Sequence, residues 1–189
     1  MTSAAAVEAS VKTAVSRYGR LDGAFNNVGR TLGSSPTTTT PLERFEQTLA
    51  VNLRSTFLCM QQELRMMQQS GGGAIVNNSS IGGTRGFANI QDYCAAKWGV
   101  IGLTKAAALE SAAQGIRINV IAPGLVATER FESIRTQQSS LLESRLKEIP
   151  LGRPADMREI ADAVIWLLGP ACGFLTGAVI PLDGGECAR

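Results

Sequence analysis

The chain of 189 residues contains no histidine, so no catalytic or metal site in it can use an imidazole. Its four cysteines, Cys59, Cys94, Cys172 and Cys187, are scattered and form no C-x-x-C pair. Protein zinc sites use closely spaced cysteine and histidine ligands, so we predict neither a metal site nor a thiol–imidazole pair. Scattered cysteines of this kind are typical of reduced thiols, which predicts a cytoplasmic protein.

Strong charge and long apolar runs are also missing. The formal net charge is +2, without a basic stripe interleaved with aromatic residues, so we expect no nucleic-acid partner. Glu8 and Lys12 interrupt the alanines near the amino end, and no run approaches the length of a membrane span, so we expect no membrane association. With 44% apolar and 18% charged residues, the composition is that of one ordinary globular domain.

The most informative stretch of the chain is residues 74–97. An apolar run, Ala74 to Val76, changes at once to asparagines, serines and glycines. This pattern is typical of a buried parallel strand that ends in a polar loop at its carboxyl end, where open α/β sheets bind ligands. Tyr93 and Lys97 follow four residues apart, so on a helix they project from one face, about 40° apart. We expect both to point towards the strand end that carries Ser80.

These three side chains suit the interconversion of an alcohol and a carbonyl. A phenol normally loses its proton near pH ~10, but an ammonium a few ångströms away favours the phenolate. Lys97 would thus make Tyr93 an acid or base usable near neutral pH. The Ser80 hydroxyl can hydrogen-bond the reacting oxygen and hold it beside the tyrosine. By itself, a tyrosine with a lysine four residues later also fits an ordinary exposed helix surface.

The succession of Ser80, twelve residues, Tyr93, three residues and Lys97 resembles the short-chain dehydrogenase/reductase family. The family usually reads I-V-N-x-S-S before the serine and Y-x-A-[SA]-K on the helix, and this chain has IVNNSS and YCAAK. The resemblance implies a Rossmann-like α/β fold, with a doubly wound parallel sheet in three α/β/α layers. It also implies a small alcohol or carbonyl substrate, NAD or NADP as cofactor, and a Lys97 that holds the nicotinamide ribose.

A fourth catalytic residue is expected inside a long helix that runs from about residue 41 into the sixties. Thr40, Pro41 and Glu43 form a capping-box pattern at its start. Asn52 lies within this helix, where asparagine is unfavourable unless its side chain or the freed backbone is needed. The family has a catalytic asparagine in a similar V-N-L context that holds a water in the proton relay to the lysine. The resemblance gives this role to Asn52, and a simply satisfied buried amide is the alternative.

Two segments resemble the family's cofactor-binding motifs, although each alone would be interpreted as a turn. Asn26 to Gly29 follow a predicted strand, Leu21 to Phe25, and match N-N-A-G, which lies under the dinucleotide and steadies the sheet. Pro123 to Thr128 follow a predicted strand, Ile116 to Ile121, and match P-G-x-V-x-T, which holds the nicotinamide carboxamide. Proline and glycine would end that strand and leave backbone donors free for a ligand. The cofactor-binding residues implied are Asn26, Val28, Gly29, Tyr93, Lys97, Pro123, Gly124, Val126 and Thr128.

The remaining segments complete the expected order of elements. A helix is predicted over residues 3–18, ended by Gly19, and the helix of Tyr93 continues to about Ala112. Residues 129–149 are charged and helical in character, and in the family this insert is the lid over the substrate. A helix then places Ile160, Val164, Trp166 and Leu167 towards the core, and a final strand covers Ala178 to Leu182.

The family's usual opening has no counterpart in this sequence. That opening is a strand, the turn T-G-x-x-x-G-I-G, a helix and the strand that selects NAD or NADP; one βαβ unit takes roughly 30 residues or more. Nothing of that size precedes Leu21, so residues 1–189 are expected to form a single, N-terminally truncated Rossmann domain. Without the glycine-rich turn and helix terminus for the pyrophosphate, NAD or NADP should bind weakly or not at all.

Two functions from different classes therefore stay open. One is an NAD(P)-dependent oxidoreductase with Asn52, Ser80, Tyr93 and Lys97 as its catalytic tetrad. The other is a non-catalytic fragment that cannot bind a dinucleotide and acts at most as an assembly partner. Helices over residues 41–69 and 93–112 carry more apolar and small positions than one sheet face can cover, which predicts a homodimer or homotetramer.

Overall fold

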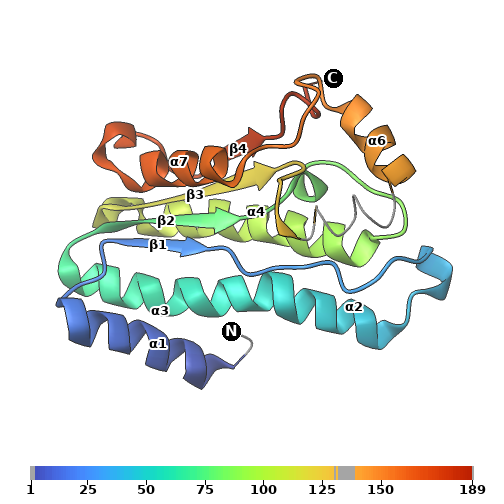
Figure 1. The fold of residues 1–189 in the computed structure, drawn as a ribbon. Coiled ribbons are helices and arrows are strands. Elements are labelled where there is room, and N and C mark those ends of the chain that lie inside the picture. The colour runs from blue at the N-terminus through green and yellow to red at the C-terminus, as the bar shows by residue number, and fades with distance from the viewer. Residues whose placement is uncertain (1–2, 130, 132–138, 189) are drawn as a thin grey trace.

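The structure, a computed structural model, describes residues 3–129, 131 and 139–188. In this part of the chain a parallel sheet is covered by helices on both faces (Figure 1). Its strands lie side by side in chain order: β1 (Gly23–Asn26), β2 (Gly73–Asn78), β3 (Ile116–Pro123) and β4 (Val179–Leu182). The predicted Rossmann-like doubly wound α/β fold is confirmed.

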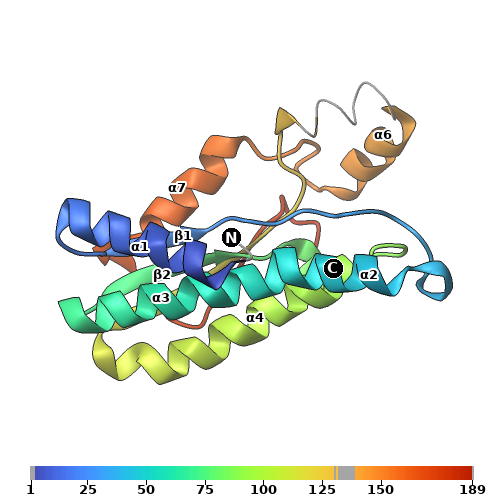
Figure 2. The ribbon, with the colours of Figure 1, turned by 90° about the horizontal axis from the view of Figure 1, so that it is seen from below.

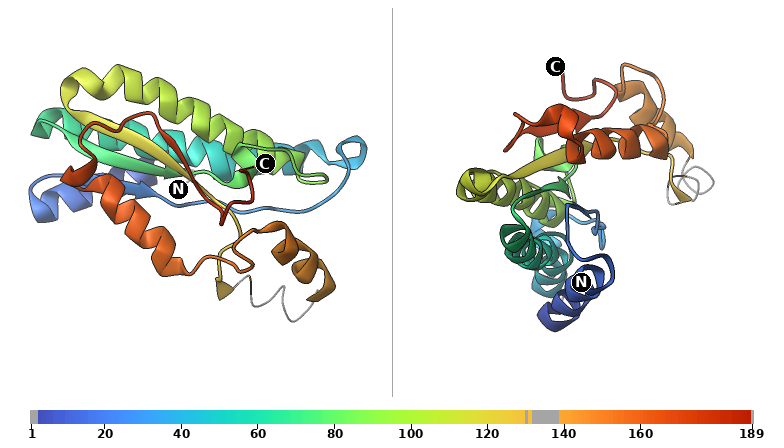
Figure 3. Two further views of the ribbon diagram at one scale, coloured as in Figure 1. Left: turned by 90° about the horizontal axis from the view of Figure 1, so that it is seen from above. Right: turned by 90° about the vertical axis from the view of Figure 1, so that its left-hand side faces the viewer.

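The α-helices of the described residues differ in length and in how close they lie to this sheet. They are α1 (Ala4–Tyr18), α2 (Leu42–Leu49), α3 (Ser55–Ser70), α4 (Gln91–Ser111), α6 (Ser139–Glu148) and α7 (Met157–Leu168). A π-helical turn, η2 (Ala50–Arg54), joins α2 to α3 into one rod that runs beside α4 (Figure 2). The helices α3 and α4 cover one face of the sheet and α7 the other, while α1 packs against α3 (Figure 3, right). Short 3₁₀ turns are η1 (Thr37–Thr39), η3 (Ile81–Gly83), η4 (Ala112–Gln114) and η5 (Pro170–Cys172).

Alternating side chains of the central strands explain the two-sided core. Ile75 of β2 packs with Met60 and Met67 of α3, whereas the next residue, Val76, packs with Leu167 of α7 on the opposite face. Successive residues of a strand point to opposite faces, so a strand that is buried on both sides needs a continuous apolar run. The apolar runs in the sequence therefore mark the buried middle of the sheet correctly.

The predicted capping box at the start of the long helix is wrong. The helix α2 begins at Leu42, and Pro41 at its N-cap makes no side-chain cap hydrogen bond. The Thr40 hydroxyl instead accepts a hydrogen bond from Nη2 of Arg44 at 3.0 Å and one from the side chain of Gln91. A contact with a residue far along the chain thus replaces the local cap.

The predicted inward position of Trp166 on α7 is also wrong, since this side chain is 49% exposed. Val164 and Leu167 are buried and Ile160 packs against the same cluster, as predicted. Because neighbouring residues of a helix differ by about 100° around its axis, Trp166 cannot share the stripe of Leu167.

The segment predicted as a charged insert, residues 129–149, is described in part. The helix α6 covers Ser139–Glu148, while residues 130 and 132–138 lie outside the described residues. No helix among the described residues is long and apolar enough to cross a membrane. At the sheet edge formed by β1, the Phe25 side chain is 37% exposed.

Candidate active site

Lys97 of α4 and Asn52 of η2 reach the same point beneath the turn that follows β1. Both side chains are buried, and Nζ of Lys97 donates a hydrogen bond to the main-chain oxygen of Asn78 at 2.8 Å. A Cβ atom at Gly29 would lie 2.7 Å from Oδ1 of Asn52 and 2.8 Å from Nζ of Lys97. Both distances are shorter than real Cβ contacts, so any side chain at this position would displace Asn52, Lys97 or the turn itself.

Asn52 lies in the π-helical turn, and its amide is fully engaged with the backbone. Its Oδ1 accepts from the N–H of Arg30 at 2.9 Å, and its Nδ2 donates to the oxygens of Arg30 at 3.0 Å and Thr48 at 2.9 Å. Single π-turns inside α-helices occur frequently at functional sites. The side chain thus ties the rod of α2 and α3 to the loop after β1.

Ser80 and Tyr93 meet at Gly82 in the loop after β2. The Ser80 Oγ accepts a hydrogen bond from the N–H of Gly82 at 3.1 Å. A Cβ at Gly82 would lie 3.3 Å from Cε1 of Tyr93 and 3.6 Å from Oγ of Ser80. The Tyr93 ring also faces the lysine, because Nζ of Lys97 lies 5.7 Å from its centroid. The structure therefore brings the four predicted catalytic side chains together around two glycines.

The electrostatics of this cluster are set mainly by burial. Loss of hydration lowers the pKa of Lys97 to about 8, because a charged amine is disfavoured away from water. The amine therefore stays mostly protonated at neutral pH and loses its proton in mildly alkaline solution. A cation at this place favours the phenolate form of the adjacent Tyr93.

The predicted cofactor segment after β1 divides into an inner and an outer part. Asn26 is buried, and its Nδ2 donates to Oε2 of Glu63 and to Oδ1 of Asn77, both at 2.9 Å. This amide therefore ties β1 to α3 and β2. Burial raises the pKa of Glu63 to about 7, partly offset by the hydrogen bond from Asn26. Val28 is 39% exposed, so the Val28–Gly29 main chain is the part of the turn that can face a ligand.

The second predicted cofactor segment begins where β3 ends at Pro123. The N–H of Gly124 donates to the oxygen of Leu182 at 3.0 Å, and that of Thr128 donates to the oxygen of Val126 at 2.9 Å. The expectation of free backbone donors is therefore wrong for Gly124, while the Thr128 hydroxyl, the group expected to hold the carboxamide, accepts from the N–H of Phe131 at 3.3 Å. Among the described residues no hydrogen bond of the Val126 N–H is found.

Sequence reasoning missed a buried ion pair beside Tyr93. Asp92 is fully buried, and its carboxylate accepts from the N–H of Tyr93 at 2.9 Å, from Oγ1 of Thr48 at 2.9 Å and from Nε of Arg44 at 3.1 Å. One signal was present: Arg44 and Thr48 are four residues apart, and an acidic residue directly precedes the tyrosine. Nothing in the sequence shows that Arg44 and Thr48 lie next to Asp92 in the folded chain.

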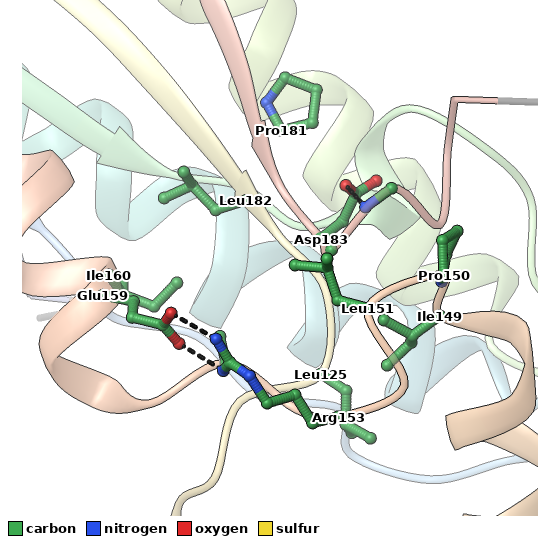
Figure 4. Close-up of a pocket in the computed structure, with 13 residues that line it drawn as sticks. Leu125, Ile149, Pro150, Leu151, Arg153, Glu159, Ile160, Pro181, Leu182 and Asp183 are labelled. Carbon is green, nitrogen blue, oxygen red and sulfur yellow. Dashed lines mark hydrogen bonds and ion pairs between the residues drawn. The ribbon is translucent and has the colours of Figure 1, made fainter.

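A pocket of about 520 Å³ lies beside β4 rather than at the catalytic cluster (Figure 4). Its lining is mostly apolar and includes Leu125, Leu151 and Leu182. At its rim Arg153 and Glu159 form a bidentate ion pair, in which Nη1 donates to Oε2 and Nη2 to Oε1, both at 2.8 Å. None of the four predicted catalytic residues lines this pocket, so the position of the reacting groups, not the volume of the cavity, defines the candidate active site.

Comparisons with known proteins match nearly the whole chain. A family model described as enoyl-(acyl carrier protein) reductase matches residues 1–186. Levodione reductase of Leifsonia aquatica is 37% identical over 189 residues, covering 97% of this chain and 71% of that protein. A 2,5-dichloro-2,5-cyclohexadiene-1,4-diol dehydrogenase of Sphingobium indicum is 39% identical over 184 residues, covering 96% of this chain and 73% of that protein.

Solved structures agree with these sequence matches. The crystal structure of levodione reductase has a TM-score of 0.94 and 37% identity, with 100% of this chain and 75% of that chain covered. The structure of ElxO with NADP bound has a TM-score of 0.95 and 34% identity, covering 100% of this chain and 76% of that one. A xylitol dehydrogenase with NAD⁺ bound has a TM-score of 0.92 and 30% identity, covering 97% and 76%.

Proposed function

Because the chain belongs to the short-chain dehydrogenase/reductase family of oxidoreductases, we propose that it interconverts an alcohol and a carbonyl with Tyr93 as the acid/base. The observation that carries the proposal is the meeting of Asn52 and Lys97 at Gly29, next to Ser80 and Tyr93 at Gly82. The substrate is a small molecule with a hydroxyl or carbonyl group. The relatives named as levodione reductase and cyclohexadiene-diol dehydrogenase support this class of substrate.

Each residue has a distinct role in the proposed reaction. The Tyr93 hydroxyl gives a proton to the carbonyl oxygen or takes one from the alcohol. The Ser80 hydroxyl orients that same oxygen, and the Lys97 ammonium favours the phenolate. Asn52 holds the loop at Arg30 through its amide. From its place beside Lys97 it would also complete the proton relay that returns to Tyr93 the proton given to the substrate. NAD or NADP, when bound, supplies or accepts the hydride.

The residues present fit the nicotinamide half of such a cofactor. Gly29 leaves open the space beside Asn52 and Lys97 that a side chain would fill, and the Val126 N–H has no hydrogen bond within the part of the chain that the structure describes. Lys97 would hold the ribose, while Pro123, Gly124 and Thr128 shape the turn that carries Val126. The buried Asn26 side chain fixes the end of β1 by its hydrogen bonds to Glu63 and Asn77. The neighbours titled with NADP and NAD⁺ support this cofactor class.

Residues 1–189 contain no counterpart of the glycine-rich turn that takes the pyrophosphate, and we propose that they form a single Rossmann-type domain without it. A polypeptide of these residues alone should therefore bind NAD or NADP weakly, because the phosphates lack a helix terminus.

Fluorescence titration with NADH and NADPH, with turnover measured for Tyr93→Phe, tests this function. The variant should lose turnover and keep its fold, because only the ionisable oxygen is removed. A Tyr93→Phe enzyme that keeps most of its rate would remove Tyr93 from the mechanism. The non-catalytic alternative gains if neither dinucleotide binds even when a strand, glycine-rich turn, helix and strand are joined ahead of Met1.

A further inference from the structure

The ion pair beside Tyr93 connects the two helical segments that carry the proposed catalytic residues. Asp92 stands in the first turn of α4, directly before Tyr93, and its Oδ1 accepts the Tyr93 N–H at 2.9 Å. Amides in the first turn of a helix have no partner within the helix, so this carboxylate satisfies one of them. The main chain at Tyr93 is thereby fixed to the Asp92 side chain.

The other oxygen of the same carboxylate is held by α2. Oδ2 accepts from Thr48 Oγ1 at 2.9 Å and from Arg44 Nε at 3.1 Å. Thr48 and Asp92 are fully buried, and the Arg44 side chain is 16% exposed. Charge-assisted hydrogen bonds that are shielded from water hold a tighter geometry than exposed ones.

Thr48 continues the connection to Asn52. While its hydroxyl donates to Asp92, its main-chain oxygen accepts from Nδ2 of Asn52 at 2.9 Å. Asn52 and Tyr93 are therefore joined through Thr48 and Asp92 by three consecutive hydrogen bonds. The Thr40 hydroxyl adds a parallel tie, since Arg44 and Gln91 both donate to it.

We infer that Asp92 and Thr48 are positioning residues that set Tyr93 in place relative to Asn52 and Lys97. This inference rests on the proposed function for its kinetic consequence, but its geometric part concerns Tyr93 alone. A buried ion pair is weak evidence for stability, because an apolar replacement of similar size is often neutral. The specific consequence of the connection is the placement of the phenol.

The test uses the fact that the chain has only two tyrosines. Tyr18 is 71% exposed on α1, so Tyr18→Phe leaves Tyr93 as the single phenol whose ionisation changes the ultraviolet absorbance. In this background Thr48→Val removes one hydroxyl and keeps every charge. Because Lys97 loses its own proton near pH 8, the phenol midpoint belongs to the coupled Tyr93–Lys97 pair. If the phenol drifts from Lys97, this midpoint should rise by roughly one pH unit, and kcat should fall roughly ten- to a hundredfold with KM little changed.

Two matched variants separate positioning from a general loss of stability. Thr48→Ser keeps the hydroxyl and should restore both midpoint and kcat. Thr104→Val removes a fully buried hydroxyl on α4 that accepts from Asn77 Nδ2 at 2.9 Å. This variant should leave the Tyr93 midpoint and kcat unchanged, even if it lowers the stability of the protein. Should Thr48→Val fail to fold, Arg44→Lys keeps the charge but not the Nε hydrogen bond, and the same rise is expected.

A Tyr93 midpoint that stays at its parent value in folded Thr48→Val or Arg44→Lys overturns the inference, whatever the rates are. Failure of the proposed function looks different. In that case Tyr93→Phe keeps its turnover, or the parent has none even with the glycine-rich opening joined ahead of Met1, while the midpoint still rises in Thr48→Val. The titration needs no bound cofactor, so the geometric result stands by itself.

Discussion

Nζ of Lys97 lies 2.8 Å from the main-chain oxygen of Asn78, so the buried ammonium joins α4 directly to the last residue of β2. This hydrogen bond holds the charge near the Tyr93 ring, at 5.7 Å from the centroid, and costs the amine most of its hydration. The same burial that prepares the site therefore makes it a source of instability, and its pH dependence can be measured.

Lys97→Met should abolish most turnover and change how stability depends on pH. The folded pKa of about 8 is below the usual 10.5, so between these values the unfolded chain binds more protons than the folded one. The wild type should therefore gain about 3 kcal/mol over that pH range, and Lys97→Met should not. Denaturant unfolding at a series of pH values measures the difference.

Lys105 supplies the control for this experiment. It stands on the same helix, is exposed, and also donates to a main-chain oxygen, that of Gly177 at 3.3 Å. Lys105→Met should keep the wild-type rise in stability. If Lys97→Met shows the same rise as the wild type, the buried charge is not its source. Any residual turnover of Lys97→Met should need a higher pH, because the phenolate has lost its cation.

Gly29→Ala should disturb the site without unfolding the chain. Its new methyl group would meet Asn52 Oδ1 at 2.7 Å and Lys97 Nζ at 2.8 Å, so the turn or one of these two side chains has to move. A displacement of this kind should lower kcat/KM at least tenfold, because catalytic geometry tolerates little error. Gly173→Ala, whose methyl would meet its nearest atom at 3.5 Å far from the site, is the control. Equal steady-state rates for both variants would contradict the close approach.

Glu63→Gln should stabilise the protein at alkaline pH. The folded pKa of Glu63, about 7, is above the ordinary 4.5, so the folded state retains a proton that the unfolded chain has already released. Wild-type stability should therefore fall by about 3 kcal/mol as the pH rises from 4.5 to 7. The glutamine can still accept from Asn26 and carries no charge, so its unfolding free energy should stay flat over this range.

Glu159 provides the opposite case for the same measurement. The ion pair with Arg153 lowers the pKa of Glu159 to about 2, so its stabilising effect is present above pH 4.5 and is lost as the pH falls towards 2. Glu159→Gln should thus matter at neutral pH and cease to matter in acid. A Glu63→Gln variant that follows this second pattern would contradict the buried, protonated carboxyl.

Phe57→Asp should dissociate the proposed homodimer or homotetramer. Phe57 is 45% exposed and lines an apolar groove of about 570 Å³ between the rod of α2 and α3 and the helix α4. Leu53 and Leu103 also line this groove. A charge placed there should prevent a second copy from packing against it. Light scattering at micromolar concentration reads the mass, with the fully exposed Phe174→Asp as control. A wild type that is strictly monomeric would contradict the association.

The features that the sequence predicted well are those written in local patterns. The apolar run at Ala74–Val76 marks a strand because burial on both faces requires it, and the spacing of Tyr93 and Lys97 places both on one helix face. The features that it predicted poorly depend on distant partners. The sequence predicted a capping role for Thr40, but its hydroxyl accepts hydrogen bonds from Arg44 and Gln91 instead. No local pattern shows that Gln91 lies close enough to donate.

The same limit applied within the site. Asp92 and Thr48 are 44 residues apart, so their hydrogen bond exists only after the two helices have packed. The backbone donors after Pro123 were expected to be free, but the adjacent β4 accepts the one from Gly124. In both cases a polar group had several possible partners, and tertiary packing decided among them.

The π-helical turn at Ala50–Arg54 makes the number of residues in this rod as important as their identity. A π-turn holds one residue more than an α-helical turn, and each residue advances a helix by about 100°. Deleting a single alanine there would leave a regular, fully hydrogen-bonded helix of nearly unchanged composition. The helices on either side would nearly keep their register, because the shortened turn still closes one revolution, but Asn52 would lose the place beside Gly29 that the wider turn gives it. Insertions and deletions are thus harmful in this segment even where every individual substitution is mild, so a designer who shortens the rod for regularity would lose the site.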